Sequence, residues 1–396
     1  MTYSVAVIGT GADPDERTRD GYAMAYRHAP GYRRLESCEL VACTDIVPAN
    51  AAAFAETFDV EYIYTDHETL LEEENPDIVS VCVPPAVHAE IVLDCAEAGD
   101  VAAVHCEKPM ATTWGDCKTM VSVCNENGVQ LTIDHQRRFA TPVREAKRLL
   151  EDGTIGELRR LEWSESNLFD AGSHLFDLCD YFTGGNEPQW ALAGVDTDPD
   201  NEWFGALNDV VAVAQWEYED GTMGFASTAE GSRQTLVDAY LRLVGDDGVI
   251  ELQPDEGPPL RVRTDGGWKD IDTDGETIYG PGQSRLRHVA DKLTDVIPAL
   301  SLPLGGQPTH YERAIEHVVS SLETGAEPLI SGRRVLRGTE LVFACWESTR
   351  RRGRVDLPLD ITDNPLEALC REKYGRVGPD TEPDRRTTVE RQDTSH

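Results

Sequence analysis

Short, almost entirely apolar runs alternate with amphipathic stretches over the first 134 residues of the chain. Apolar runs predict strands at 4–8, 39–44, 77–83, 101–106 and 129–133. Apolar residues at helical spacing predict helices between them, at 21–28, 48–58, 86–98 and 112–127. Strands that are apolar throughout are buried on both faces, and their alternation with helices is typical of a parallel sheet. The pattern therefore predicts an α/β, doubly wound (Rossmann) domain at 1–135.

The pattern changes after about residue 135, where Gly-centred turns such as Glu219-Asp220-Gly221 and Asp246-Asp247-Gly248 separate longer strand-like runs. Turns of this kind join antiparallel neighbours. A helix is expected at 142–151, then strands at 158–164, 210–218, 222–227, 240–244 and 249–252, then helices at 311–323 and 333–352. We predict an α+β domain at 136–372 with an open, mainly antiparallel sheet. The polar, aperiodic residues 373–396 are predicted to be a disordered tail.

Acidic residues outnumber basic ones two to one, 72 against 36, with six lysines and a net charge of −36. Such a charge repels phosphate backbones, so no nucleic-acid partner is expected. No apolar run is long enough to cross a membrane, and the first residues do not resemble a signal peptide, so we expect a cytoplasmic protein without a membrane partner. Excess acid with few lysines is typical of proteins that work in concentrated salt, which favours a halophilic source; the alternative is an ordinary acidic cytosolic enzyme.

Ten cysteines are spread along the chain without a CxxC pair. Several lie inside apolar runs, such as VSVCV at 79–83, which indicates small buried thiols in a reducing compartment. Their spacing does not match a zinc site. We therefore expect no metal.

The first predicted strand ends in a short glycine motif, VAVIGTG, which contains Gly9 and Gly11. Such a turn lets the backbone approach a pyrophosphate at a helix N-terminus. Pro14 stands where GxGxxG has its third glycine, and we interpret 12–21 as a loop inserted before the helix. Asp45 follows the second strand, where a carboxylate binds both ribose hydroxyls and repels a 2′-phosphate. This favours NAD as the cofactor over NADP; alternatively, Asp45 only caps the next helix.

Three further segments resemble one family of enzymes: CVPPAVHAE at 82–90, HCEKPMATT at 105–113 and DAGSHLFDLCDYFTGG at 170–185. Together they resemble the Gfo/Idh/MocA oxidoreductases, the family of glucose–fructose oxidoreductase and inositol dehydrogenase. Glu107-Lys108-Pro109 is the most specific match, and the resemblance covers nearly the whole chain. It implies a nicotinamide cofactor, a small sugar or polyol substrate, and a homodimer or homotetramer formed through the open sheet.

The resemblance also places residues on the cofactor side of the site. By it, Glu107 lies beside the nicotinamide ribose, together with Lys108. Pro84 and His88 match the loop on the cofactor side. Pro85 stands where the family usually has asparagine, which removes one polar contact near the ribose.

A catalytic set is implied in the same way: Lys108 faces the substrate, and Asp170 and His174 match the family's D-x-x-x-H pair, followed by Asp177. Spacings of four and three put these last three residues on one helical face. A histidine is suited to take the hydroxyl proton as a hydride leaves, and a neighbouring carboxylate would orient its ring. Lys108 would stabilise the negative charge that develops on the same oxygen.

We predict an enzyme, an NAD(P)-dependent oxidoreductase that acts on a CH–OH group of a sugar, sugar acid or cyclitol. Two alternatives stay open: an NAD-dependent glycosidase of the same family, and a non-catalytic dinucleotide-binding sensor. His135, Arg137 and Arg138 follow the predicted strand at 129–133. They either line the cleft or pair with surface carboxylates.

Overall fold

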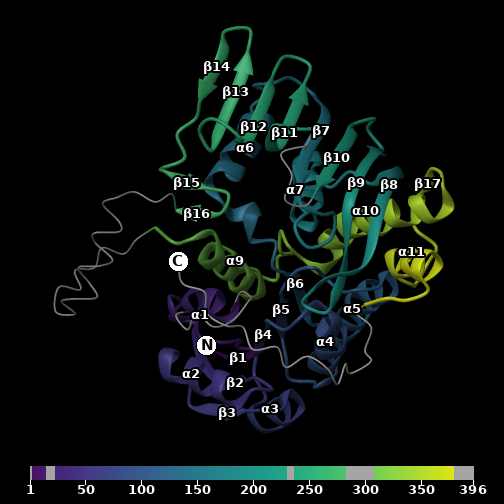
Figure 1. Ribbon diagram of the computed structural model, residues 1–396. Coiled ribbons are helices and arrows are strands. Elements are labelled where there is room, and N and C mark those ends of the chain that lie inside the picture. Colours follow the sequence, from purple (N-terminus) through teal and green to yellow (C-terminus); the bar gives the residue numbers. More distant parts are fainter. Residues whose placement is uncertain (1, 15–22, 230–235, 282–306, 379–396) are drawn as a thin grey trace, which may run out of the picture.

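The computed structural model describes residues 2–14, 23–229, 236–281 and 307–378. Figure 1 shows two sheets at opposite ends of the molecule, the N-terminal one below and the C-terminal one above. The N-terminal sheet has six strands in the order β3-β2-β1-β4-β5-β6, all paired in parallel. Its strands are β1 (Tyr3–Ile8), β2 (Cys38–Thr44), β3 (Tyr62–Tyr64), β4 (Ile78–Val81), β5 (Ala103–Cys106) and β6 (Gln130–Ile133).

This sheet confirms the predicted doubly wound domain. Its helices are α1 (Ala25–Arg33), α2 (Pro48–Phe58), α3 (His67–Glu74), α4 (His88–Glu97) and α5 (Trp114–Asn127), with a 3₁₀ turn, η1 (Pro85–Val87), before α4. β1 lies between β2 and β4, so the strand order reverses there. In open α/β sheets ligands bind at the carboxyl ends of the strands beside such a reversal. Most of the predicted inserted loop at 12–21 lies outside the described residues.

One helix from late in the sequence completes the N-terminal core. α9 (His310–Thr324) packs against α1, where a Cβ on Gly31 would lie 2.8 Å from the side chain of Ile315. Ile315 and Val319 share a buried cluster with Val5 and Ala29. Figure 1 shows α9 beside α1, so a segment from late in the sequence completes the N-terminal core.

The second sheet has nine strands in the order β14-β13-β12-β11-β7-β10-β9-β8-β17. Only the β7–β10 pair is parallel, which confirms the predicted mainly antiparallel sheet. The strands are β7 (Leu158–Glu165), β8 (Pro188–Trp203), β9 (Ala206–Tyr218), β10 (Met223–Ala229), β11 (Ala239–Gly245), β12 (Val249–Pro254), β13 (Leu260–Thr264), β14 (Gly267–Asp270) and β17 (Val355–Asp356). A small separate hairpin joins β15 (Glu276–Thr277) and β16 (Gly280–Pro281).

Helices cover one face of this second sheet. They include α6 (Thr141–Glu151), α7 (Ser173–Thr183) and α10 (Gly332–Arg351), and η2 (Gln136–Phe139) precedes α6. Trp163, Phe176 and Trp216 fill the interface, and Phe176 lies 5.0 Å from each indole ring. The opposite face leaves apolar side chains exposed, among them Val211 and Val213.

The chain stays ordered beyond residue 373, where a tail was expected to begin. α11 (Pro365–Tyr374) contains Lys373, whose ammonium lies 2.9 Å from a carboxylate oxygen of Asp196. Arg376 contacts Asp200 at 2.6 Å. Residues 379–396 lie outside the described part of the chain. Among the described helices we find none with the length and apolar character that a membrane span requires.

Candidate active site

The glycine turn after β1 is built for close backbone approach. Gly9 and Gly11 have φ angles of 85° and 67°, which side-chain-bearing residues rarely adopt. A Cβ on Gly9 would lie 2.6 Å from Val83 after β4, so only glycine fits beside that strand. The turn therefore matches a site that admits a pyrophosphate, as a dinucleotide domain requires.

Asp45 lies at the end of β2, between this turn and α2. One oxygen of its carboxylate accepts a hydrogen bond from the Gly11 N–H at 2.8 Å, and the other accepts one from the Val47 N–H at 2.8 Å. The sequence analysis left two roles open for Asp45, and its contacts are compatible with each. It borders the glycine turn, and it also holds the start of α2.

Replacing Asp45 with alanine is expected to weaken NAD binding by at least ~10-fold, because hydrogen bonds from ribose hydroxyls to a charged carboxylate are worth about 1.5–3 kcal/mol. NADP binding should fall less, since the substitution also removes repulsion of the 2′-phosphate. Calorimetric titration with each cofactor measures both affinities. Glu56→Ala, an exposed acid on α2, is the charge-matched control. Equal losses for NAD and NADP would show that Asp45 does not contact the ribose.

His88 ties together two loops at the same edge of the sheet. Its ring nitrogens lie 2.9 Å from the Pro109 carbonyl oxygen and 2.8 Å from the Val83 carbonyl oxygen. Burial lowers the pKa of His88, so the ring is neutral and donates to one of these carbonyls. Pro84 directly follows Val83 and precedes η1. The structure thus places His88 as a buried support for the loop that carries Lys108.

Glu107 turns into the protein rather than into the open edge. Its carboxylate lies 2.9 Å from Nε2 of His28, and it accepts a hydrogen bond from the Lys108 N–H at 3.2 Å. Burial raises the pKa of Glu107. The expected contact of Glu107 with the nicotinamide ribose stays a prediction, and the structure adds a partner, His28, that the sequence analysis did not consider.

Lys108, from the N-terminal domain, contacts Asp170, from the C-terminal domain, as the resemblance implies. The Lys108 ammonium donates to the Asp170 carboxylate at 2.8 Å and to the Asp170 carbonyl at 3.0 Å. Their side chains are 18% and 30% exposed, so both remain accessible to a small molecule. Lys108 follows β5, and Asp170 precedes α7.

His174 does not have the carboxylate partner that the sequence spacing suggested. Asp170 lies before the first turn of α7, where helical spacing does not apply, and it pairs with Lys108. Asp177 lies within α7, but both its oxygens bind the buried guanidinium of Arg138 at 2.7 Å. The Nδ1 atom of His174 instead lies 3.3 Å from Nδ1 of His135, with the rings perpendicular. The expected histidine–carboxylate dyad is therefore wrong.

The His174 imidazole is buried and lies near two cations, Arg137 and Lys108. Burial lowers the pKa of His174 well below its ordinary value, and Arg137, Lys108, His135 and His310 lower it further. The ring is therefore neutral near pH 7. In a pair of neutral rings, one Nδ1–H donates to the lone pair of the other nitrogen.

The sequence analysis left open whether His135, Arg137 and Arg138 line the cleft, and the first two lie at the site. His135 contacts His174 directly, and Arg137 lies between the rings of Tyr240 and Tyr279, 5.2 and 5.1 Å from their centroids. Arg138 is buried in its ion pair, so it pairs with neither the surface nor the open cleft. The tyrosines come from distant segments, and no local pattern in the sequence singled them out.

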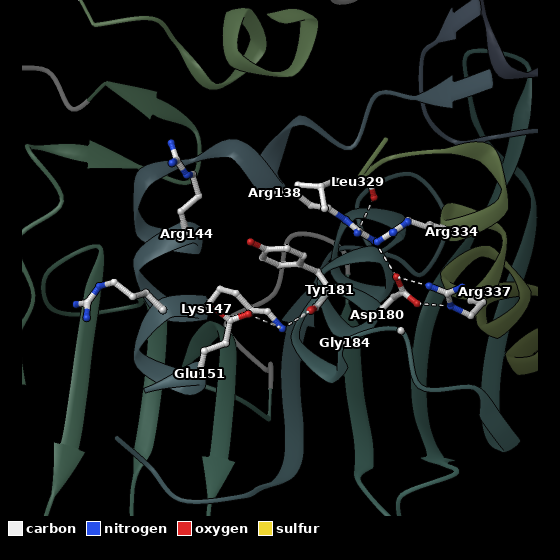
Figure 2. Close-up of a pocket in the computed structure, with 12 residues that line it drawn as sticks. Arg138, Arg144, Lys147, Glu151, Asp180, Tyr181, Gly184, Leu329, Arg334 and Arg337 are labelled. Atoms are coloured by element: carbon white, nitrogen blue, oxygen red, sulfur yellow. Dashed lines mark hydrogen bonds and ion pairs between the residues drawn. The ribbon is translucent and has the colours of Figure 1, made fainter. Parts of the chain in front are cut away.

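A separate basic pocket lies beside α6 and α7 (Figure 2). It has a volume of about 360 Å³, and half of the residues that line it are Arg or Lys, but none of them is a predicted catalytic residue. Asp180 binds Arg337 at 2.6 Å and Arg138 at 3.0 Å, and Lys147 donates to the Tyr181 carbonyl at 2.9 Å. Much of the positive charge of this pocket is thus already paired. We therefore place the candidate active site at the carboxyl edge of the parallel sheet, beside Lys108.

Comparison with known proteins agrees with this geometry. Residues 3–135 match the GFO/IDH/MocA oxidoreductase family, NAD-binding Rossmann fold, and residues 147–357 match the C-terminal α/β domain of the same family. The chain belongs to this family. Residues 3–135 of this GFO/IDH/MocA protein are therefore an NAD-binding domain, and the glycine turn and Asp45 fit that cofactor.

Two relatives of this GFO/IDH/MocA chain are enzymes named for sugar-type substrates. It is 25% identical to D-apiose dehydrogenase of Paraburkholderia graminis over 356 residues, covering 83% of this chain and 86% of the relative. It is 29% identical to 2,7-anhydro-N-acetylneuraminate hydratase of Mediterraneibacter gnavus over 281 residues, covering 66% and 70%. An oxidoreductase structure from Agrobacterium radiobacter, in complex with NAD+, L-tartaric acid and magnesium, has a TM-score of 0.69 at 20% identity, covering 90% of this chain and 98% of that chain.

Proposed function

We propose that this protein is an NAD(P)-dependent dehydrogenase that transfers a hydride between the nicotinamide and a hydroxyl or carbonyl carbon of a sugar, sugar acid or cyclitol. The observation that carries the proposal is the Lys108–Asp170 ion pair beside the neutral His174, at the carboxyl edge of the parallel sheet. Family membership supplies the cofactor, and the similarity to D-apiose dehydrogenase supports a substrate of the sugar class.

Each residue has a distinct task in alcohol oxidation. Bound NAD accepts the hydride from the carbinol carbon. His174, neutral at its site, takes the hydroxyl proton as the hydride leaves. Lys108 donates a hydrogen bond to the same oxygen and stabilises its negative charge. Asp170 holds the lysine ammonium in place through the 2.8 Å contact.

His135 takes the orienting role that a carboxylate was expected to play. For His174 to accept a proton on Nε2, its Nδ1–H must donate to Nδ1 of His135, at 3.3 Å. His135 then carries its own proton on Nε2. Burial lowers the pKa of His135 as well, which keeps its Nδ1 free to accept. His135 is thus a positioning residue for the base.

Arg137 favours sugar acids within the substrate class. In the described part of the chain its guanidinium has no carboxylate within ion-pair distance, and its hydrogen bond goes to the neutral hydroxyl of Tyr240. The guanidinium is close enough to lower the pKa of His174. A substrate carboxylate would give this cation a bidentate partner.

A direct assay of cofactor reduction tests the proposal. The purified protein is mixed with NAD or NADP in concentrated KCl, with sugars paired against the corresponding uronic acids and with inositols. The near-ultraviolet absorbance of reduced nicotinamide reports turnover. Reduction with one substrate class supports a dehydrogenase, and higher kcat/KM for the acid of a pair supports the role of Arg137. Tight NAD binding without accumulation of reduced cofactor on any substrate would contradict the proposal and favour the glycosidase or the sensor.

The acid limb of kcat/KM for oxidation is expected well below pH 6.5, the ordinary value for histidine. Burial lowers the pKa of His174, as do the facing groups Arg137, Lys108, His135 and His310. Because oxidation requires the neutral ring, a lowered pKa keeps the base active to more acidic pH. Initial rates at saturating NAD across the pH range locate the limb.

A charge-removal variant sharpens this measurement. Arg137→Gln deletes one of the cations that lower the pKa of His174, so the midpoint of the limb should move upward. Arg159→Gln removes an exposed arginine paired with Asp246 and should leave the midpoint unchanged. A wild-type midpoint at or above pH 6.5 would mean that His174 is not the titrating base.

A second candidate is a reaction that uses NAD without net turnover, such as glycoside cleavage. The observation in its favour is the 29% identity to a 2,7-anhydro-N-acetylneuraminate hydratase. Such an enzyme oxidises its substrate transiently and returns the hydride in each cycle. Product formation from an aryl glycoside or an anhydro sugar, with no accumulated reduced cofactor, would select it over the dehydrogenase.

The net charge, the free cysteines and the exposed apolar residues fit a particular environment and assembly of the protein. The net charge of −36 fits work in concentrated salt, as in a halophile, where screening reduces self-repulsion. Ten free cysteines fit the reducing cytoplasm. The exposed apolar residues Leu192, Val211 and Val213 on the open face of the second sheet fit a dimer or tetramer contact.

A further inference from the structure

A buried cluster of two histidines and two carboxylates lies between α1 and the ends of β5 and β6. Its members are His28 from α1, His105 from β5, Glu107 after β5 and Asp134 after β6, with side chains at most 6% exposed. Nε2 of His28 lies 2.9 Å from Glu107 and 3.3 Å from Asp134. Nε2 of His105 lies 3.6 Å from the other oxygen of Asp134. Four potential ligand groups therefore converge in a dry part of the fold.

The hydrogen bonds of His105 fix the direction in which its lone pair points. The Thr132 hydroxyl donates its single proton to the Val104 carbonyl at 3.2 Å. It must therefore accept from the Nδ1–H of His105, at 2.9 Å. In the neutral ring this leaves the lone pair on Nε2, facing a carboxylate oxygen of Asp134. Two acceptors then face each other in the protein interior.

No placement of protons gives every buried polar atom of this cluster a hydrogen-bond partner. In the part of the chain that the structure describes, neither Nε2 of His105 nor either oxygen of Asp134 has a hydrogen-bond partner. A proton on His28 serves Glu107, with which it has hydrogen-bond geometry. A second proton on His105 would place like charges on rings whose centroids are 5.0 Å apart. A buried carboxylate without donors is costly unless another cation neutralises it.

We propose that this cluster binds one divalent transition-metal ion of the zinc class, through Nε2 of His28, Nε2 of His105 and the carboxylates of Asp134 and Glu107. Ligand atoms about 2.0–2.1 Å from a tetrahedral zinc lie about 3.3–3.4 Å from one another. The observed separations of 2.9, 3.3 and 3.6 Å bracket that value. A divalent charge neutralises both carboxylates, and two imidazoles with two carboxylates suit zinc.

The surroundings of the histidines fit metal binding as well. Nδ1 of His28 lies 2.7 Å from the Ser80 hydroxyl, and Nδ1 of His105 lies 2.9 Å from the Thr132 hydroxyl. Metal-bound histidines are held in this way by a second partner on the far nitrogen. Cysteine spacing predicted no metal, but these ligands are histidines and carboxylates that only the fold brings together.

The ion has a structural role, since all its ligands are buried and four protein groups fill its coordination. It links α1 to the loops after β5 and β6. Glu107 directly precedes Lys108, and Asp134 directly precedes His135, so the ion holds both loops that carry active-site residues. Its loss should loosen the cofactor half of the site.

Metal content measured by mass spectrometry tests the proposal without any knowledge of the substrate. The full chain is purified without a polyhistidine tag or chelator, and about one zinc-class ion per chain is expected. Asp134→Asn should lower the occupancy at least ~10-fold. Thr132→Val, which removes only the support of His105, should weaken retention against a chelator by about 10–100-fold. His67→Gln, at the partly exposed His67–Asp94 pair, is the matched control and should retain the ion.

Cobalt uptake keeps the test decisive if a variant fails to fold. The wild-type protein is stripped with a strong chelator, its circular dichroism is checked, and Co²⁺ alone is added. Intense visible absorption bands of tetrahedral cobalt, displaced by Zn²⁺, would support the site. A folded wild-type protein that carries no metal when purified and takes up no cobalt would overturn the proposal. Metal bound equally by wild type and Asp134→Asn would also overturn it.

Discussion

Replacing Lys108 with methionine is expected to lower kcat by about 10²–10³-fold, the usual cost of removing a donor that stabilises a developing oxyanion. Methionine keeps the unbranched chain but has neither the charge nor the N–H donors. The Asp170 carboxylate, which loses its 2.8 Å partner, is 30% exposed and can be hydrated, so the fold should survive. Steady-state rates on the substrate found by the cofactor assay measure the effect.

Two controls separate chemistry from structure in that experiment. Lys269→Met removes an exposed lysine on β14 and should leave kcat unchanged. The dissociation constant for NAD and the melting temperature of Lys108→Met should stay close to the wild-type values. A kcat within about threefold of wild type would remove Lys108 from the mechanism, because a lost oxyanion donor costs far more.

The N-terminal domain was readable from the sequence because buried parallel strands are apolar throughout. β1, β2 and β4 to β6 all appear where apolar runs predict them. β3 was missed because it has only three residues, and two of them are exposed. A strand that short, at the edge of a sheet, leaves no periodic signal and is defined by its pairing with β2.

β8 shows why the second domain was harder to predict. Its sixteen residues include Pro188, Pro199 and several Asp and Asn residues, a composition typical of loops. Pairing with β9 nevertheless makes it one of the longest strands in the sheet, with side chains alternating between buried and exposed. Long-range pairing, which a single sequence does not display, outweighs local propensity here.

The same distinction holds in the active site: residues in short motifs could be predicted from the sequence, whereas contacts made by the fold could not. Gly9, Gly11 and Lys108 stand in short motifs, so their positions at the sheet edge could be predicted. The orientation of His174 could not, because its partner His135 lies 39 residues away in sequence and the nearby acids pair elsewhere. Spacing along a helix shows which residues share a face but not which neighbour meets that face.

The buried cluster around Asp134 escaped the sequence analysis for a related reason. Its two histidines are 77 positions apart, by subtraction of 28 from 105, and neither stands in a metal-binding motif. They meet because α1 places the side chain of His28 beside the residues that follow β5 and β6. A ligand set assembled in this way becomes visible only as unsatisfied buried atoms.

Replacing His174 with glutamine is expected to lower kcat for oxidation by at least ~100-fold, the scale of a general base. Glutamine retains much of the volume and still forms a hydrogen bond, but it cannot take up a proton. Because the pKa of His174 lies well below 6.5, the loss should be present throughout the neutral range, where the wild-type ring is already an active base. Single-turnover rates with bound NAD isolate the hydride step.

The acid limb of the pH profile shows whether the loss is chemical. If His174 is the base, His174→Gln abolishes the limb as well as the rate, whereas a packing defect would lower the rate and leave the limb in place. His317→Gln offers a matched control, since His317 is also partly buried and accepts one hydrogen bond, from the Leu329 N–H at 2.9 Å. An unchanged limb in His174→Gln would show that His174 is not the titrating base.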